Sequence, residues 1–268
     1  MPNRFNFNMW QTIRSETAAA AAEEPMLASF LHLTVLRHDS LAKVLAFHLS
    51  SKLCGSTMDA RALNEIYLEA LEDDPEIVEA VQADINACYE RDPACDRYFL
   101  PLLYFKGFHA IQAHRINHWL WERGRDTLAY FLQNRASEVF GIDIHPAARF
   151  GRGIMFDHGT GIVIGETAVL GDDISILHGV TLGGSGKESG DRHPKVGNGV
   201  MIGANASILG NIRIGHCAKI GAGSVVVRDV DAQTTVVGVP AKTVGVSTNV
   251  PADDMDQSFS ADDYLFVI

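Results

Sequence analysis

Residues 196–231 read VGNGVM IGANAS ILGNIR IGHCAK IGAGSV VVRDVD, and this stretch decides the fold. An aliphatic residue opens every group of six, and glycine often follows it. A period of six fits neither a helix nor a plain strand, but it fits a short strand plus a tight turn, stacked as a solenoid. The same period extends back to Ile144, with a two-residue slip after Gly161 and an interruption at 183–195. Twelve such hexapeptides, three to a triangular coil, predict about four coils.

The residue types within each hexapeptide support this geometry. The leading aliphatic side chain is expected to point into a narrow core, and the glycine after it can take turn torsions that a Cβ would resist. The fifth position is often small, as it is at Ala148, Ala168, Ala206, Ala218 and Ser224. A solenoid exposes its ends, so we expect a cap or self-association.

Glycine also marks where the solenoid begins. Of the 24 glycines, only Gly55, Gly107 and Gly124 precede residue 141. Residues 251–268 hold five aspartates and no Lys or Arg. The sequence therefore predicts an α+β chain in three parts: an α-helical cap and assembly domain at 1–140, a parallel β-helix at 141–246, and an acidic flexible tail at 247–268.

The first part carries the spacing of amphipathic helices. Apolar stripes run through 41–49 and 78–88, and further helices are predicted over 57–71, 100–123 and 126–139. Six histidines fall in this half, and we expect five of them to be buried core residues: His32, His48, His109, His114 and His118.

Composition and charge exclude several classes of protein. Hydrophobic residues make up 47% of the 268 residues and charged residues 21%, which excludes a disordered chain and a coiled coil. The net charge of −11 gives no sign of nucleic-acid binding. No apolar run reaches about 18 residues, so no membrane span is predicted. Residues 1–14 lack a signal-peptide core, which predicts a cytoplasmic protein whose four scattered cysteines are reduced thiols.

Three departures from the repeat carry the functional information, since a solenoid needs neither histidines nor a loop. The first is the Gly-rich interruption at 183–195, which contains Arg192 and His193. The second is His158, which interrupts a repeat between Asp157 and a glycine. The third is Asp143, just before the first repeat. An aspartate beside a histidine can fix its tautomer and stabilise its charged form, and a separation of 15 residues is compatible with contact between stacked coils.

With these segments together, the chain resembles the serine O-acetyltransferases of the bacterial cysteine pathway, from about residue 22 to residue 246. The resemblance implies that the β-helix is left-handed, against the usual right-handed rule for parallel crossovers. The stretches that carry it include RDPA at 91–94, DIHPAA at 143–148, GIMFDH at 153–158, GETA at 165–168, GDRHPK at 190–195 and GVPA at 238–241.

The resemblance implies transfer of acetyl from acetyl-CoA to the hydroxyl of L-serine. A serine hydroxyl is a weak nucleophile and needs a positioned base. By resemblance His158 is that base, oriented by Asp143, and His193 binds substrate or shares in proton transfer. Serine is a zwitterion, so Arg192 is expected to grip its carboxylate, together with His193, while Asp92 and Asp157 take its ammonium group.

The resemblance also implies partners and assembly. No permanent cofactor is expected, and acetyl-CoA is a co-substrate whose groove includes Gly184, Ala204, Lys219, Ala222 and Lys242. The family forms trimers or dimers of trimers with sites between subunits, and L-cysteine often inhibits it. The C-terminal Ile268 is expected to dock into O-acetylserine sulfhydrylase.

Two other functions stay open at this stage. A hexapeptide acyltransferase acting on another hydroxyl or amine acceptor would need the same repeat. His145, His178 and His216 also leave open a metal-dependent lyase with an interfacial zinc site, or an inactive scaffold, although His145 and His216 fall at turn positions. His178 departs from the Gln or Gly of the family. We expect no metal.

Overall fold

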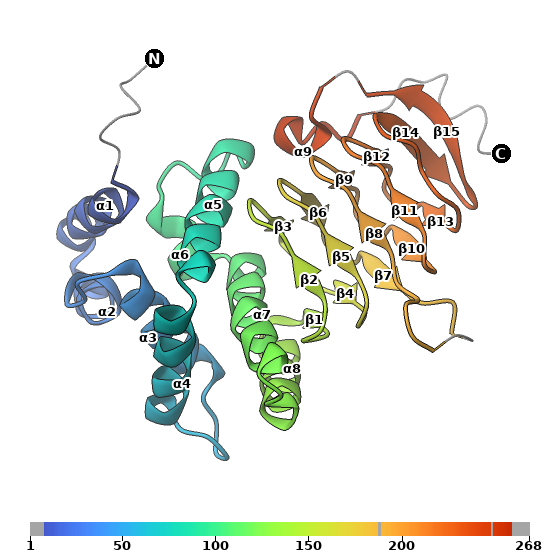
Figure 1. Ribbon diagram of the computed structural model, residues 1–268. Coiled ribbons are helices and arrows are strands. Elements are labelled where there is room, and N and C mark those ends of the chain that lie inside the picture. The colour runs from blue at the N-terminus through green and yellow to red at the C-terminus, as the bar shows by residue number, and fades with distance from the viewer. Residues whose placement is uncertain (1–7, 187–188, 248, 259–268) are drawn as a thin grey trace.

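The computed structural model describes residues 8–186, 189–247 and 249–258, and it places a helical half beside a parallel β-solenoid (Figure 1). Side chains of the described residues close the boundary between the halves, because one continuous hydrophobic core runs through both. No helix in these ranges is both long and apolar enough to cross a membrane. All four cysteines are free thiols, as predicted.

The helical half forms because capping residues and apolar stripes coincide. The side chains of Asn8, Ser40, Asp59 and Asp74 each accept a hydrogen bond from a first-turn amide. The elements are α1 (Met9–Glu23), η1 (Pro25–Leu27), α2 (Ala28–Leu31), η2 (His32–Leu36), α3 (Leu41–Leu53), α4 (Ala60–Asp73), α5 (Pro75–Arg91), α6 (Phe99–Tyr104), α7 (Lys106–Glu122) and α8 (Asp126–Phe140).

The single helix predicted over 100–123 is wrong, because the structure has two helices there. Phe105 is extended (φ −89°, ψ 106°) and separates α6 from α7. At the start of α7, Gly107 lies directly against β3: a Cβ on this glycine would be 2.2 Å from the carbonyl oxygen of Phe156. The break therefore lets the backbone of α7 pack onto the solenoid.

The predicted burial of the helical histidines is confirmed for three of five. His48, His109 and His114 are buried. His32 is exposed and His118 is half-buried, so the prediction is wrong for these two. His32 opens the short π-helical segment η2, where the α-helical stripe that would bury it is not continued.

The solenoid has three faces built from short parallel strands. Its sheets are β1-β4-β7-β10-β13, β11-β8-β5-β2 and β15-β14-β12-β9-β6-β3, and the final pair is antiparallel. The strands are β1 (Asp143–Ile144), β2 (Arg149–Phe150), β3 (Met155–Asp157), β4 (Val163–Ile164), β5 (Val169–Leu170), β6 (Ser175–Leu177), β7 (Thr181–Gly183), β8 (Lys195–Val196), β9 (Met201–Ile202), β10 (Ser207–Leu209), β11 (Arg213–Ile214), β12 (Lys219–Ile220), β13 (Val225–Val226), β14 (Thr234–Gly238) and β15 (Ala241–Val246).

The stack has five levels rather than about four. Leu182, which opens the interruption, supplies a full strand residue in β7. Val230 continues the stack as a bridge to Ile214, and Val236 continues it as a partner of Ile220. This parallel architecture is consistent with the left-handed β-helix that the resemblance implies.

A buried ion pair fixes the helical half against the first coil. Asp84 of α5 is fully buried and pairs with Arg115 of α7 at 2.8 Å. Asp84 also accepts a hydrogen bond from the amide of Ile154, and Arg115 donates to the carbonyl of Gly151. Two helices and one turn of the solenoid are thus joined by charge-assisted hydrogen bonds.

Part of the segment predicted as a flexible tail over 247–268 is helical. Residues 251–254 form a short helix, α9 (Pro251–Asp254), that lies on the solenoid beside α5. The Ser175 hydroxyl donates to the carbonyl of Ala252, and Asp253 pairs with the buried Arg91 at 2.9 Å. These polar groups, together with the burial of Pro251 and Ala252, hold the segment in place. Ile268 lies outside the described residues.

Candidate active site

His158 lies at the turn between β3 and β4, and the turn presents its ring to solvent. Its φ is +57°, in the left-handed region, and its side chain is 78% exposed. Its Nε2 lies 3.8 Å from a carboxylate oxygen of Asp157. The ring of His178, at the same corner one coil on, has its centroid 6.3 Å away. This corner therefore presents an accessible imidazole next to a carboxylate.

Asp143 lies close to this corner without touching His158. Its amide donates to the carbonyl of Ile162, so the two segments run side by side. Its carboxylate accepts a hydrogen bond of 2.7 Å from Gln133 of α8. Among the described residues no hydrogen bond or ion pair joins Asp143 to His158. No sequence pattern indicated Gln133 as a partner of Asp143.

Asp92 lies at the end of α5, next to the strand that leads to His158. It follows the last residue of α5, and its carboxylate accepts the amide of Ala94 at 2.8 Å. The end of α5 packs on β3 through a small cluster that joins Cys88 and Met155. Among the described residues, no hydrogen bond or ion pair joins Asp92 to Asp157 or His158.

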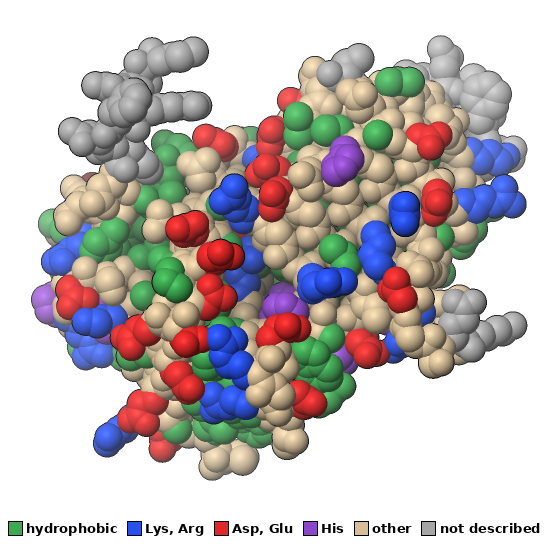
Figure 2. Space-filling view, in the orientation of Figure 1, with side chains coloured by type: hydrophobic (Ala, Val, Ile, Leu, Met, Phe, Trp, Pro, Cys, Tyr) green, Lys and Arg blue, Asp and Glu red, His purple; other side chains and the backbone are tan. Residues whose placement is uncertain are grey.

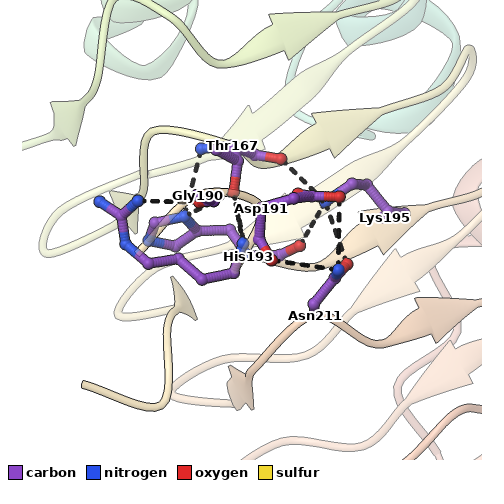
Figure 3. Close-up of polar contacts among 7 residues, drawn as sticks. Thr167, Gly190, Asp191, His193, Lys195 and Asn211 are labelled. Carbon is purple, nitrogen blue, oxygen red and sulfur yellow. Dashed lines mark hydrogen bonds and ion pairs between the residues drawn. The ribbon is translucent and has the colours of Figure 1, made fainter. Parts of the chain in front are cut away.

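His193 lies at a different corner, where the interruption folds back onto the preceding coil (Figure 3). Its Nδ1 accepts a hydrogen bond of 3.1 Å from the amide of Thr167. The Thr167 hydroxyl accepts the amides of Arg192 and His193, both at 3.0 Å. The ring is 7% exposed, and burial together with the nearby Arg192 lowers the pKa of His193.

Lys195 anchors the base of the same loop. Its Nζ donates to the carbonyls of Thr167 and His193 and pairs with Asp191 at 2.6 Å. Asn211 contacts both Lys195 and Asp191, which closes the cluster drawn in Figure 3. The loop is therefore ordered next to His193.

The guanidinium of Arg192 is occupied by a carboxylate. It donates to Glu166 at 2.6 Å and to the carbonyl of Gly190 at 3.0 Å. The hydrogen bond from Arg192 lowers the pKa of Glu166. Neither Glu166 nor Thr167 was assigned a role from the sequence, although both belong to the GETA stretch that carries the resemblance.

The two histidines are not brought together within one chain. His158 lies at the corner between the six-stranded and five-stranded sheets. His193 lies at the corner between the five-stranded and four-stranded sheets. The full width of the five-stranded sheet lies between them. Within one chain, the two imidazoles therefore lie at different corners of the solenoid.

The residues predicted to line an acetyl-CoA groove divide in the same way. Ala204 and Ala222 lie at the turns β9–β10 and β12–β13, on the His158 corner. Gly184 lies beside His193, since a Cβ on it would be 3.5 Å from the His193 Nε2. Lys242 is exposed on β15. Lys219 donates to the carbonyl of Ser258, so the C-terminal segment covers it.

A cavity in the described part of the chain, between the two halves, does not contain these groups. It has a volume of about 560 Å³ and lies between α5, α7 and the first turns of the solenoid, with Glu76, Glu79, His114 and Arg152 in its wall. None of the predicted site residues lines it. The described residues contain no cluster of three or more His, Cys, Asp or Glu arranged to hold a metal ion. On the face shown in Figure 2, acidic and basic side chains are interspersed.

A solenoid of hexapeptide repeats with a loop excursion and corner histidines defines a hexapeptide-repeat transferase. The family model described as bacterial transferase hexapeptide matches residues 193–228, and the model described as serine acetyltransferase, N-terminal, matches residues 9–113. The chain belongs to the serine acetyltransferase family.

Two relatives show how far the similarity extends. The serine acetyltransferase of Salmonella typhimurium is 56% identical over 259 residues, 96% of this chain and 95% of that protein. The crystal structure of serine acetyltransferase from Neisseria gonorrhoeae is 72% identical with a TM-score of 0.92, covering 96% of this chain and 99% of that one. The matched structures include serine acetyltransferases in complex with serine, with cysteine and with coenzyme A.

Proposed function

We propose that this protein transfers the acetyl group of acetyl-CoA to the hydroxyl of L-serine, giving O-acetyl-L-serine and CoA. The observation that carries the proposal is the match to serine acetyltransferases along 96% of the chain. Acetyl-CoA is consumed as a co-substrate, and the proposal requires no resident cofactor. The reaction predicts a cytoplasmic enzyme, since the co-substrate is a metabolite of that compartment.

His158 is the proposed general base. Its 78% exposed side chain leaves a ring nitrogen within reach of an incoming hydroxyl. The ring takes the proton of the serine hydroxyl as that oxygen attacks the thioester carbon. When the carbon–sulfur bond then breaks, the ring returns this proton to the sulfur, which leaves as the CoA thiol. Asp143 is the proposed orienting carboxylate: its strand runs beside the turn that carries His158. The exposed ring is free to turn toward Asp143 once substrate and a neighbouring subunit enclose it.

The charged groups supply both signs that a zwitterionic substrate needs. Arg192 binds the serine carboxylate, which replaces Glu166 on the guanidinium with a second carboxylate of the same geometry. His193 is the next residue along the loop, and it binds the same end of the substrate. Asp92 and Asp157 receive the ammonium group from the His158 side.

The division between corners supports a site shared by neighbouring subunits. One subunit supplies His158 and Asp157, and the next supplies Arg192 and His193. A trimer, or a dimer of trimers, satisfies this geometry, since each copy offers both corners. The acetyl-CoA arm then lies along the seam, between Ala204 and Ala222 of one copy and Gly184 of the next, with Lys242 near phosphates.

Lys219 joins this groove only when the C-terminal segment leaves it. Its Nζ now holds the carbonyl of Ser258 and lies 3.7 Å from a carboxylate oxygen of Asp256. We include L-cysteine as a feedback inhibitor, because it matches serine in every charged group and differs only by a thiol in place of the hydroxyl. A solved relative in complex with cysteine supports this reading.

The C-terminal Ile268 is the proposed contact with O-acetylserine sulfhydrylase. Deleting residues 259–268 should abolish binding to the sulfhydrylase and spare acetyl transfer, because the described site residues all precede residue 259. Isothermal titration with the full-length chain as the control measures the first effect. Equal affinity of both chains would refute the contact.

An acceptor panel tests the reaction itself. The protein is supplied with acetyl-CoA and, in parallel, L-serine, homoserine, a hexose or a simple amine, and release of free CoA thiol is followed. We expect serine to give the fastest release. If another acceptor exceeded serine, the protein would be a hexapeptide acyltransferase of different specificity. If a chelator leaves the rate of CoA release unchanged, the two acyltransferase hypotheses are favoured over a metal-dependent lyase.

A further inference from the structure

The hydrogen bond from Thr167 to His193 determines which nitrogen of the ring carries the proton. The amide of Thr167 can only donate, and it lies 3.1 Å from His193 Nδ1. The Thr167 hydroxyl lies 3.0 Å from the same atom. In a neutral imidazole one nitrogen accepts and the other donates. Nδ1 is therefore the acceptor, and the proton is on Nε2.

Thr167 holds the backbone of the loop as well as the ring. Its hydroxyl accepts the amides of Arg192 and His193, and its carbonyl accepts Lys195 at 3.0 Å. These contacts come from the tight turn between β4 and β5, which is closed by a hydrogen bond from Ala168 to the carbonyl of Gly165. One residue of the coil thus holds three positions of the loop, 192, 193 and 195.

Two glycines lie next to the Nε2 edge of the ring. A Cβ on Gly165 would lie 2.0 Å from His193 Nε2, and a Cβ on Gly184 would lie 3.5 Å from it. The imidazole therefore occupies space that a side chain at residue 165 would fill.

We propose that Thr167 is a positioning residue that keeps His193 in the tautomer protonated at Nε2, so that His193 donates a hydrogen bond to an anionic oxygen of the substrate and does not act as a base. This inference rests on the proposed function. It separates the roles of the two histidines: His158 takes the proton of the hydroxyl, and His193 stabilises negative charge. The oxygen is either the serine carboxylate or the oxyanion of the tetrahedral intermediate.

Nitrogen NMR of the whole protein tests the tautomer without any reaction. The chain is labelled with ¹⁵N-histidine, and the signals of His193 are assigned by their loss in His193→Gln. We expect a protonated Nε2 and an unprotonated Nδ1 near pH 7.5. Thr167→Ser, which keeps the hydroxyl, should give the same pattern. Thr167→Val keeps the backbone amide but removes the hydroxyl that accepts the amides of Arg192 and His193, so the loop should move His193 away from the Thr167 amide and give a mixture of tautomers. A wild-type ring protonated at Nδ1 would overturn the proposal, whatever the activity.

Kinetics with the same variants test the role of the donor. Thr167→Val should lower kcat/KM for serine by roughly tenfold to a hundredfold, and Thr167→Ser by no more than about twofold. His193→Gln, whose amide can donate from the position of Nε2 but cannot act as a base, should retain at least roughly tenfold more activity than His193→Ala. A loss mainly in KM identifies the carboxylate, and a loss mainly in kcat identifies the oxyanion. Equal activity of the Gln and Ala variants would contradict a donor role.

The two tests fail separately. If the wild-type protein releases no CoA with serine, the proposed function fails while the tautomer measurement still stands. If serine is acetylated but Thr167→Val keeps both wild-type activity and a single Nε2-protonated ring, the function stands and the role of Thr167 is refuted. Circular dichroism of each variant confirms that the solenoid is folded.

Discussion

At the scale of single residues, the exposed His158 and the buried His193 are placed for different work. His158 was predictable because a histidine between Asp157 and a glycine interrupts the hexapeptide pattern. His193 was predictable because it stands in the loop that breaks the repeat. Thr167 was not, since it fills an ordinary turn position within a hexapeptide. Its role depends on a loop that returns to it 26 residues later.

Replacing His158 tests the base directly. His158→Ala should lower turnover by at least roughly a hundredfold, because the hydroxyl loses its proton acceptor. Steady-state thiol release at saturating serine and acetyl-CoA measures this loss. His32→Ala removes another exposed histidine, distant in the helical half, and should leave turnover unchanged. Near-normal turnover of His158→Ala would reassign the base.

At the scale of secondary-structure elements, the hexapeptide repeat and the apolar stripes could be recognised in the sequence, but the junctions between elements could not. The hexapeptide period predicted the strands, and the stripes at 41–49 and 78–88 lie in α3 and α5. The break at Phe105 could not be predicted from the local sequence, because it accompanies a tertiary contact between Gly107 and the backbone of Phe156. The helix α9 could not be predicted either. This acidic segment is held in place by contacts with Arg91 and Ser175, which are distant from it in the sequence.

The junction between the halves depends on the buried pair of Asp84 and Arg115. Asp84→Asn leaves the guanidinium of Arg115 buried without its counter-charge and should lower the free energy of unfolding by about 3–5 kcal/mol. Urea unfolding followed by circular dichroism measures the change. Asp39→Asn breaks a solvent-exposed pair with Lys43 and should change the free energy of unfolding far less. Similar small losses in both variants would show that the buried pair does not hold the junction.

Two buried histidines should make the helical half sensitive to acid. Burial lowers the pKa of His48 to about 4 and the pKa of His109 to about 3. Both stay neutral in the fold, whereas the unfolded chain takes up protons below about pH 6.5. The stability they contribute is therefore complete above that pH and falls as the pH drops toward 4, by up to about 1.4 kcal/mol per pH unit for each.

His48→Gln isolates one of these contributions, because glutamine can still donate to the carbonyl of Leu103. The free energy of unfolding, measured in urea between pH 7 and pH 4.5, should fall less steeply with acid in His48→Gln than in the wild type. His32→Gln, at an exposed position, should keep the wild-type slope. Identical slopes in all three proteins would show that His48 does not contribute.

At the scale of the whole molecule, one chain carries two incomplete halves of the proposed site. The sequence predicted the residues of each half, because both depart from the repeat. It could not show that they lie at different corners, since that depends on where the slip at 162–163 and the loop at 183–195 fall around the coil. The same ambiguity applies to Asp143, whose strand lies beside the His158 turn while its carboxylate binds Gln133.

Mixed oligomers test the shared site. His158→Ala and His193→Ala subunits are each expected to be nearly inactive alone. If every site takes His158 from one subunit and His193 from the next, random co-assembly should restore about a third of the sites in trimers that contain both variants, and about a quarter in such dimers of trimers. Co-expression with two affinity tags and thiol-release assays of the doubly purified oligomer measure this. Activity no higher than in either parent would place both histidines in one subunit.

The most direct measurement of the central claim follows the acetyl group itself. The wild-type protein is incubated with L-serine and acetyl-CoA labelled with ¹³C in the acetyl carbonyl, and products are identified by NMR and mass spectrometry. We predict labelled O-acetyl-L-serine and free CoA in equal amounts, and neither above background when serine is omitted. Free CoA with labelled acetate alone, or no serine-dependent product at all, would contradict the assignment.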